Sequence, residues 1–265
     1  MPDGSGVVVA VTAPFPGATQ RGADLLRLDP STGDVSPLLQ RAEPRESLNM
    51  PAWWPDRQTL LFERQDLGGQ PVGAPGQEVP RYPSRIERVL ADGSGRGLLI
   101  GEGRQPDAAP DRTRVVYART TNQGASMLVW SQADGEIQTL VPEGRCADVA
   151  YPRFSPGSDQ VAFMAPQSAI GSSVPSLLGR WFTPAVAYAH GIPWDAWVVN
   201  VDGSNLHRAG ETAADEPSES WSPDGASLFV CSGTGSFVVD AHTGGLAPLP
   251  FVQGYGPTVW LATAP

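Results

Sequence analysis

A proline-centred turn motif recurs along this chain and limits the folds that it can adopt. The fullest copy occupies residues 221–225 (Trp-Ser-Pro-Asp-Gly), and eroded copies surround Pro55, Pro110 and Pro156. Each copy lies between two short apolar runs, such as the one at residues 59–62. Proline sets φ at such a turn, and Asp or Gly tolerates the backbone conformation that follows. Each copy therefore predicts two antiparallel strands joined by a tight turn.

A second hairpin signal follows each pair of expected strands. An alternating apolar run ends there in a Gly-containing turn, and a brief apolar segment comes after it. These turns are at residues 31–33, 92–93, 134–135, 202–203 and 243–244. Four strands joined by hairpins, repeated every 40 to 45 residues or so with insertions, are typical of a β-propeller blade. The sequence therefore predicts an all-β fold, a β-propeller of about five four-stranded blades.

The repeats resemble the TolB-type branch of WD-like β-propeller repeats, whose hallmark is the turn at residues 221–225. The resemblance covers essentially the whole chain and is specific for the fold, since the hallmark is a structural turn. Two copies depart from it, because Ala108 and Ala109 lack the aromatic ring and the hydroxyl, and Gly157 replaces Asp. The resemblance implies a bacterial protein in an extracytoplasmic setting, periplasmic or at the cell surface, with the targeting segment absent from the sequence.

The two ends of the chain supply complementary halves of one motif copy. Residues 2–4 (Pro-Asp-Gly) match its second half, and residues 257–260 match its first half. Strands from both termini would therefore close the first blade and cover its open edge. The expected blades of this single domain, residues 1–265, are residues 1–40 with 253–265, 46–102, 103–143, 146–211 and 215–250. A sixth blade would require residues that the sequence lacks.

Composition argues against several classes of partner and site. The chain has 28 acidic and 18 basic residues, a net charge of -10, whereas nucleic acid and anionic membranes attract basic faces. No apolar run approaches the ~18 residues that a membrane-spanning helix needs. Cys146 and Cys231 lack the CxxC spacing of zinc and redox motifs. A disulfide between them and two buried thiols are both open alternatives.

Motifs of enzyme chemistry are missing from the sequence, which favours a non-enzymatic protein without a cofactor. There is no G-x-S-x-G, phosphate loop or dinucleotide fingerprint. Aligning the first strands of the blades places Glu102, Asp148 and Asp215 at one equivalent position, together with Ser47 and Gln253. Such an acidic ring at a channel mouth could hold a cation, receive a basic peptide or flank a sugar bond, as in five-bladed glycosidases. Polar, solvated loops are the simpler interpretation, so metal binding stays open.

Two long insertions separate the second and third strands of their blades, at residues 65–83 and 166–193. Successive hairpins alternate faces, so both insertions are expected on the face opposite the proline turns, where long loops suggest a functional surface. The first is rich in Gly, Pro and Gln and predicts a mobile or extended loop. The second carries apolar side chains worth about 2 kcal/mol each on burial. Its candidate partner-binding residues are Leu177, Leu178, Arg180, Trp181, Phe182, Tyr188 and Trp194.

These patterns predict a protein-interaction module or scaffold subunit that binds another protein through the face carrying both insertions. The apolar residues of the second insertion could instead pack on the propeller's own face as a lid. One rival is a five-bladed carbohydrate-active enzyme using the acidic ring. The other is a subunit of a larger complex that docks through residues 166–193.

Overall fold

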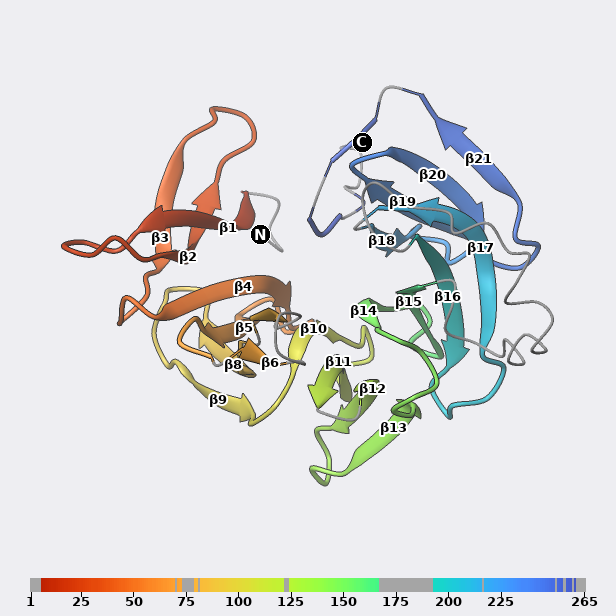
Figure 1. Ribbon diagram of the computed structural model, residues 1–265, viewed down its shortest axis with the longest axis horizontal. Coiled ribbons are helices and arrows are strands. Elements are labelled where there is room, and N and C mark those ends of the chain that lie inside the picture. The colour runs from red at the N-terminus through yellow and green to blue at the C-terminus, as the bar shows by residue number, and fades with distance from the viewer. Residues whose placement is uncertain are drawn as a thin grey trace. The chain divides into compact units, whose positions relative to one another are not determined.

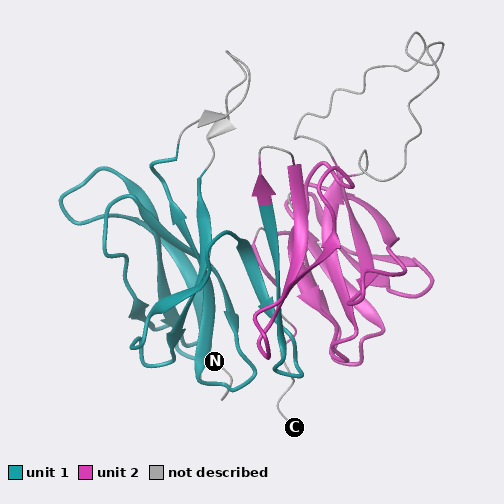
Figure 2. Ribbon diagram, turned by 90° about the horizontal axis from the view of Figure 1, so that it is seen from below, with its two compact units in different colours: residues 1–119 teal, residues 120–265 magenta. Residues whose placement is uncertain are grey.

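The computed structural model describes residues 6–260, except 70, 73–78, 81, 122–123, 167–192, 216, 251, 255 and 259. All regular secondary structure in this part of the chain is β (Figure 1). The chain forms two compact units, residues 1–119 and 120–265 (Figure 2). The boundary between the units falls within one strand.

The strands follow the predicted hairpin pattern. The first eleven are β1 (Val7–Pro14), β2 (Arg21–Leu28), β3 (Val35–Leu39), β4 (Glu46–Trp53), β5 (Thr59–Asp66), β6 (Pro71–Val72), β7 (Val79–Pro80), β8 (Ser84–Leu90), β9 (Gly97–Ile100), β10 (Arg104–Ala108) and β11 (Arg114–Thr121). The others are β12 (Gly124–Ser131), β13 (Ile137–Val141), β14 (Ala150–Phe154), β15 (Gln160–Pro166), β16 (Trp194–Asn200), β17 (His207–Ala214), β18 (Ser218–Trp221), β19 (Ser227–Ser232), β20 (Gly235–Asp240) and β21 (Leu246–Leu249).

These strands form five antiparallel blades in chain order, with the orders β1-β2-β3, β4-β5-β8-β9, β10-β11-β12-β13, β14-β15-β16-β17 and β18-β19-β20-β21. The predicted all-β propeller of five blades is therefore confirmed. A sixth sheet, β6-β7, lies within the first insertion, whose composition had predicted an extended or mobile loop.

A β-bulge marks the first strand of three blades. The register shifts within β4, β10 and β14, around Met50, Gln105 and Tyr151, whose φ angles are 48°, 54° and 53°. Each of these residues precedes the first proline of a turn motif. A bulge leaves a residue outside the ladder, so proline, which has no N–H to donate, is accommodated there. In the last blade Glu219 replaces this proline, and β18 pairs with β19 without a shift.

Hydrogen bonds explain the hallmark turn at residues 221–225. Ser222 N–H donates to Ser227 O at 2.8 Å, and Gly225 N–H donates to Ser222 O at 2.9 Å. The Ser222 hydroxyl donates to the Asp224 carboxylate at 2.6 Å and accepts from Ser227 N–H at 2.9 Å. Gly225 has a φ of 72°, in the left-handed region that glycine adopts without steric cost. The same two backbone bonds form in the copies where Trp54 and Ala109 replace the serine, so the turn is structural and the hydroxyl only adds to it.

Each unit contains an apolar cluster built from the inward-facing residues of its strands. In the first unit the buried members are Val8, Leu25, Leu48, Leu60, Phe62 and Val89. In the second they are Ala162, Met164, Ala196, Val198, Ala209, Trp221, Leu228, Val230, Val239 and Ala241. β15 is buried along nearly its whole length, which is why its sequence is a continuous apolar run and not an alternating one.

Two indole hydrogen bonds reach the backbone of first strands in the second unit. Trp221 Nε1 of β18 donates to Arg153 O of β14 at 3.1 Å, and Trp260 Nε1 donates to Ser220 O of β18 at 3.2 Å. The chain after β21 therefore returns to β18. The predicted closure of the first blade by residues 257–260 stays a prediction, since the sheet of β1, β2 and β3 has three strands in the described part of the chain.

Candidate functional site

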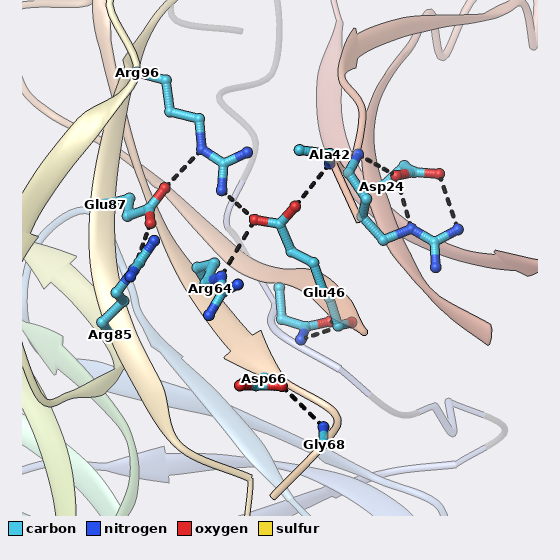
Figure 3. Close-up of polar contacts among 12 residues, drawn as sticks. Asp24, Ala42, Glu46, Arg64, Asp66, Gly68, Arg85, Glu87 and Arg96 are labelled. Carbon is cyan, nitrogen blue, oxygen red and sulfur yellow. Dashed lines mark hydrogen bonds and ion pairs between the residues drawn. The ribbon is translucent and has the colours of Figure 1, made fainter. Parts of the chain in front are cut away.

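The base of the first insertion is fixed to its blade by four hydrogen bonds. Leu67 N–H donates to Arg45 O at 2.7 Å, and Arg45 Nη2 donates to Gly68 O at 2.9 Å. Asp66 N–H donates to Pro83 O at 2.9 Å, and the Asp66 carboxylate accepts from Gly68 N–H at 2.9 Å (Figure 3). Both ends of the insertion therefore leave the blade from defined positions.

A buried carboxylate supports the same blade. The Glu46 side chain is 3% exposed and accepts hydrogen bonds from Arg96 Nη2, from Arg64 Nε at 3.3 Å and from Ala42 N–H at 2.7 Å (Figure 3). Burial alone would raise the pKa of Glu46, but these donors and the charge of Arg96 outweigh it and lower the pKa. Glu46 is therefore charged at neutral pH and locked in place, which suits a structural role.

Arg96 joins this carboxylate to a second one. Its Nε donates to Glu87 at 2.6 Å, and Arg85 Nε donates to the other oxygen of Glu87 at 2.6 Å. The guanidinium of Arg96 also lies over the Phe62 ring, 5.6 Å from its centroid. The resulting ionic cluster, Glu46, Arg64, Arg85, Glu87 and Arg96, ties β4, β5 and β8 to the segment before β9 (Figure 3).

Glu63 is a further buried acid of this blade, with 5% of its surface exposed. Its oxygens accept from the Ser84 hydroxyl at 2.7 Å and from Gln105 N–H at 3.2 Å. Burial raises the pKa of Glu63 despite these bonds and the nearby charge of Arg104. The contacts tie β5 to β8 and β10.

Sequence reasoning did not single out these acids. The only sequence signal was a charged residue inside an apolar strand pattern, as in TLLFERQD at β5 and SRIERVL at β8. A charge at a position expected to face the core must be paired or lose its charge.

The second insertion also begins and ends on paired strand residues. Pro166 and Trp194 are Cα partners at the ends of β15 and β16. Trp194 is partly buried against the apolar cluster of its own unit, and its carbonyl accepts from the Thr212 hydroxyl at 2.9 Å. The other candidates in this insertion, Leu177, Leu178, Arg180, Trp181, Phe182 and Tyr188, lie outside the described residues. Lid and partner-binding roles for them remain predictions.

The three acids of the predicted ring belong to different units. Glu102 is exposed in the first unit, and Asp148 and Asp215 are half-buried in the second. Among the residues that the structure describes, no three His, Cys, Asp or Glu side chains lie close enough together to hold a metal ion. A role for the three acids at one site stays a prediction.

Cys146 and Cys231 are buried free thiols. Of the two open alternatives, the structure therefore contains thiols and not a disulfide. Burial raises the pKa of the Cys146 thiol to about 11, which keeps it protonated and unreactive.

In the described ranges, no helix has the length and apolar character needed to span a membrane.

Comparison with solved structures places the chain among β-propellers. It is 18% identical to a protein described as TolB from Agrobacterium tumefaciens, with a TM-score of 0.54 over 86% of this chain and 70% of that one. A puromycin-hydrolyzing peptidase from Mycobacterium tuberculosis gives a TM-score of 0.56 at 13% identity, over 94% of this chain and 39% of that one. An oligogalacturonate lyase from Vibrio parahaemolyticus gives a TM-score of 0.52 at 10% identity, over 85% and 59%.

No family model and no curated protein matches the chain. At these identities the likeness to solved structures shows the fold, which is the TolB-like propeller that the turn motif predicts. The same fold occurs in a peptidase and a lyase. It does not by itself decide the function.

Proposed function

We propose that this propeller, which shares its fold with TolB, is a non-enzymatic protein-interaction module or scaffold subunit. It binds a partner protein through the insertions at residues 65–83 and 166–193. An extracytoplasmic setting and membership of a larger complex are parts of the same proposal.

One observation carries this proposal: both insertions leave from and return to strand ends that are held rigidly. At the first, β5 and β8 pair up to Gln65 and Ser84, and the four hydrogen bonds at its base continue beyond that pair. At the second, the ladder continues to Pro166 and Trp194. Long connections on a rigid scaffold are the usual place for binding residues.

The composition of the insertions supports a protein partner. The second insertion combines Trp181, Tyr188 and Arg180, the three residue types most enriched among binding hot spots. The first carries the β6-β7 hairpin, in which Val72 pairs with Val79. Aromatic and arginine side chains of this kind are enriched in protein interfaces, which supports a protein partner over a small polar substrate.

The pairing of Pro166 with Trp194 allows a clean deletion. Replacing residues 167–193 by Asn-Gly would join two paired strand residues through a two-residue turn that suits a hairpin. A partner captured by the full chain from its source cells would be identified, produced separately and titrated against both chains by calorimetry. The control variant is Asp202→Asn, which gives the turn at residues 202–203 the same Asn-Gly sequence and leaves both insertions intact.

We expect the shortened chain to keep the melting temperature of the full chain and to lose binding by about 100-fold or more, as removal of hot-spot side chains does. The control variant should bind like the full chain. Equal binding by the shortened chain would overturn the proposal, and a lowered melting temperature would identify the insertion as a lid. Cleavage of a polysaccharide by the purified chain, abolished by Glu102→Gln, Asp148→Asn or Asp215→Asn, would support the enzyme instead.

A further inference from the structure

The last residue of the five-residue turn motif is glycine in the fullest copy but arginine in two neighbouring blades. In all four copies this residue is left-handed, with φ angles of 62° at Arg57, 67° at Arg112, 62° at Ser158 and 72° at Gly225. Only glycine adopts this conformation without steric cost. Arginine at two such positions suggests that its side chain has a use that offsets the strain.

Both arginines line the same cavity of the first unit. The cavity has a volume of about 440 Å³, and its other walls are Trp53, Trp54, Pro55, Ala108 and Pro110. It lies where the turn after β4 meets the turn after β10, two strands that pack together. Its volume falls within the range of roughly 300–1,000 Å³ that is usual for ligand sites.

The two turn aspartates near the cavity are occupied by their own turns. Asp56 accepts from Gln58 N–H at 2.7 Å and from Thr59 N–H at 2.8 Å. Asp111 accepts from Thr113 N–H at 2.9 Å and from Arg114 Nη2 at 2.8 Å.

The guanidinium groups of Arg57 and Arg112 are both on exposed residues. Arg112 is close enough to Asp56 for its charge to help the turn donors lower the pKa of that carboxyl, although burial opposes them. Within the described part of the chain, no ion pair or side-chain hydrogen bond fixes either guanidinium. Two forks of N–H donors are therefore available beside an aromatic and proline wall, in a chain whose net charge is -10.

We propose that this cavity binds an acidic peptide segment of a partner, with Arg57 and Arg112 pairing with its carboxylates. Guanidinium forks match carboxylates in shape and charge. The wall of Trp53, Pro55 and Pro110 takes an apolar side chain that lies between the two acids. A bare inorganic anion would pair with the arginines but leave this wall unused. The site lies at the opposite end of β5 from the first insertion, so it does not depend on the insertion surface.

The probe is the peptide Ac-Glu-Pro-Phe-Glu-NH2, titrated into the full chain by calorimetry, with the Gln-Pro-Phe-Gln peptide as its uncharged match. The variants are Arg57→Gly and Arg112→Gly, which remove the charge and relieve the backbone at the same time. Ser158→Gly is the matched control, since it makes the same backbone change in a turn outside the cavity. Both Arg→Gly variants should melt no lower than the parent chain, because each relieves a left-handed residue at an exposed position, so a loss of binding cannot reflect unfolding.

We expect the acidic peptide to bind and its uncharged match to bind at least about tenfold more weakly, the loss typical of one charge-assisted hydrogen bond. Each Arg→Gly variant should show a similar loss, and Ser158→Gly should show none. The chain without residues 167–193 should bind the peptide normally, which separates this site from the proposed function. The inference is overturned if the peptide does not bind, if the Arg→Gly variants bind it equally, or if inorganic phosphate or trigalacturonate binds more tightly.

Discussion

Replacing Glu46 by Gln tests whether the ionic cluster supports the blade that carries the first insertion. The change keeps the side-chain volume but removes the charge that faces Arg96 and Arg64, whose side chains are 25% and 18% exposed. Breaking a fully buried ion pair costs about 3–5 kcal/mol. Because both arginines reach some solvent and Arg96 retains Glu87, we expect a loss of about 2–3 kcal/mol in the free energy of unfolding.

Urea unfolding at pH 7 measures this loss, with Glu211→Gln as its control. Glu211 also pairs with an arginine, but its side chain is 66% exposed, so its loss should stay below about 0.5 kcal/mol. The folded-state pKa of Glu46 is lowered, so its contribution to stability is present above the unfolded value near 4.5 and is lost as the pH falls through the folded value. The gap between the parent chain and Glu46→Gln should therefore narrow in acid. Equal losses for the two variants would refute the argument.

Three further predictions concern a turn, a buried acid and a thiol. Gly225→Ala should lower the free energy of unfolding by about 1–2 kcal/mol in urea titrations, because its φ of 72° strains any residue with a Cβ; an unchanged midpoint would contradict this. Burial raises the folded-state pKa of Glu63, so the stability that its protonated form contributes is lost as the pH rises from about 4.5 through the folded-state pKa. Glu63→Gln, which cannot ionise, should therefore become more stable relative to the parent chain over this pH range; parallel pH profiles of the two chains would refute this. Cys146, with its pKa raised to about 11, should react with a disulfide reagent at pH 8 only as fast as the chain unfolds, and rapid labelling of the native chain would show it to be accessible.

Local signals were enough to predict the blades. The turn motif and the second hairpin signal involve residues close together in the chain, so their chemistry could be read without knowing what packs against them. The first proline of each of three motif copies also has a local explanation. It directly follows the left-handed bulge residue, which is Met50, Gln105 or Tyr151. The pairing of β6 with β7 was not predicted, because the segment is rich in Gly and Pro and each strand is only two residues long.

The ionic cluster and the cavity could not be predicted in the same way. Glu46 pairs with Arg96 from fifty positions away, and only the packing of β4, β5 and β8 brings their charges together. Arg57 and Arg112 look like ordinary surface residues until β4 and β10 place their turns beside one cavity. Each feature depends on contacts between strands, which no local pattern encodes.

Hydrogen–deuterium exchange on the full chain, alone and bound to its purified partner, tests the central proposal most directly. We predict slower exchange of residues 65–83 and 166–193 in the complex, with little change in the Gly-containing turns at residues 92–93 and 202–203. Protection confined to the proline turns at residues 55–57 and 110–112, with both insertions unchanged, would contradict the proposed binding face.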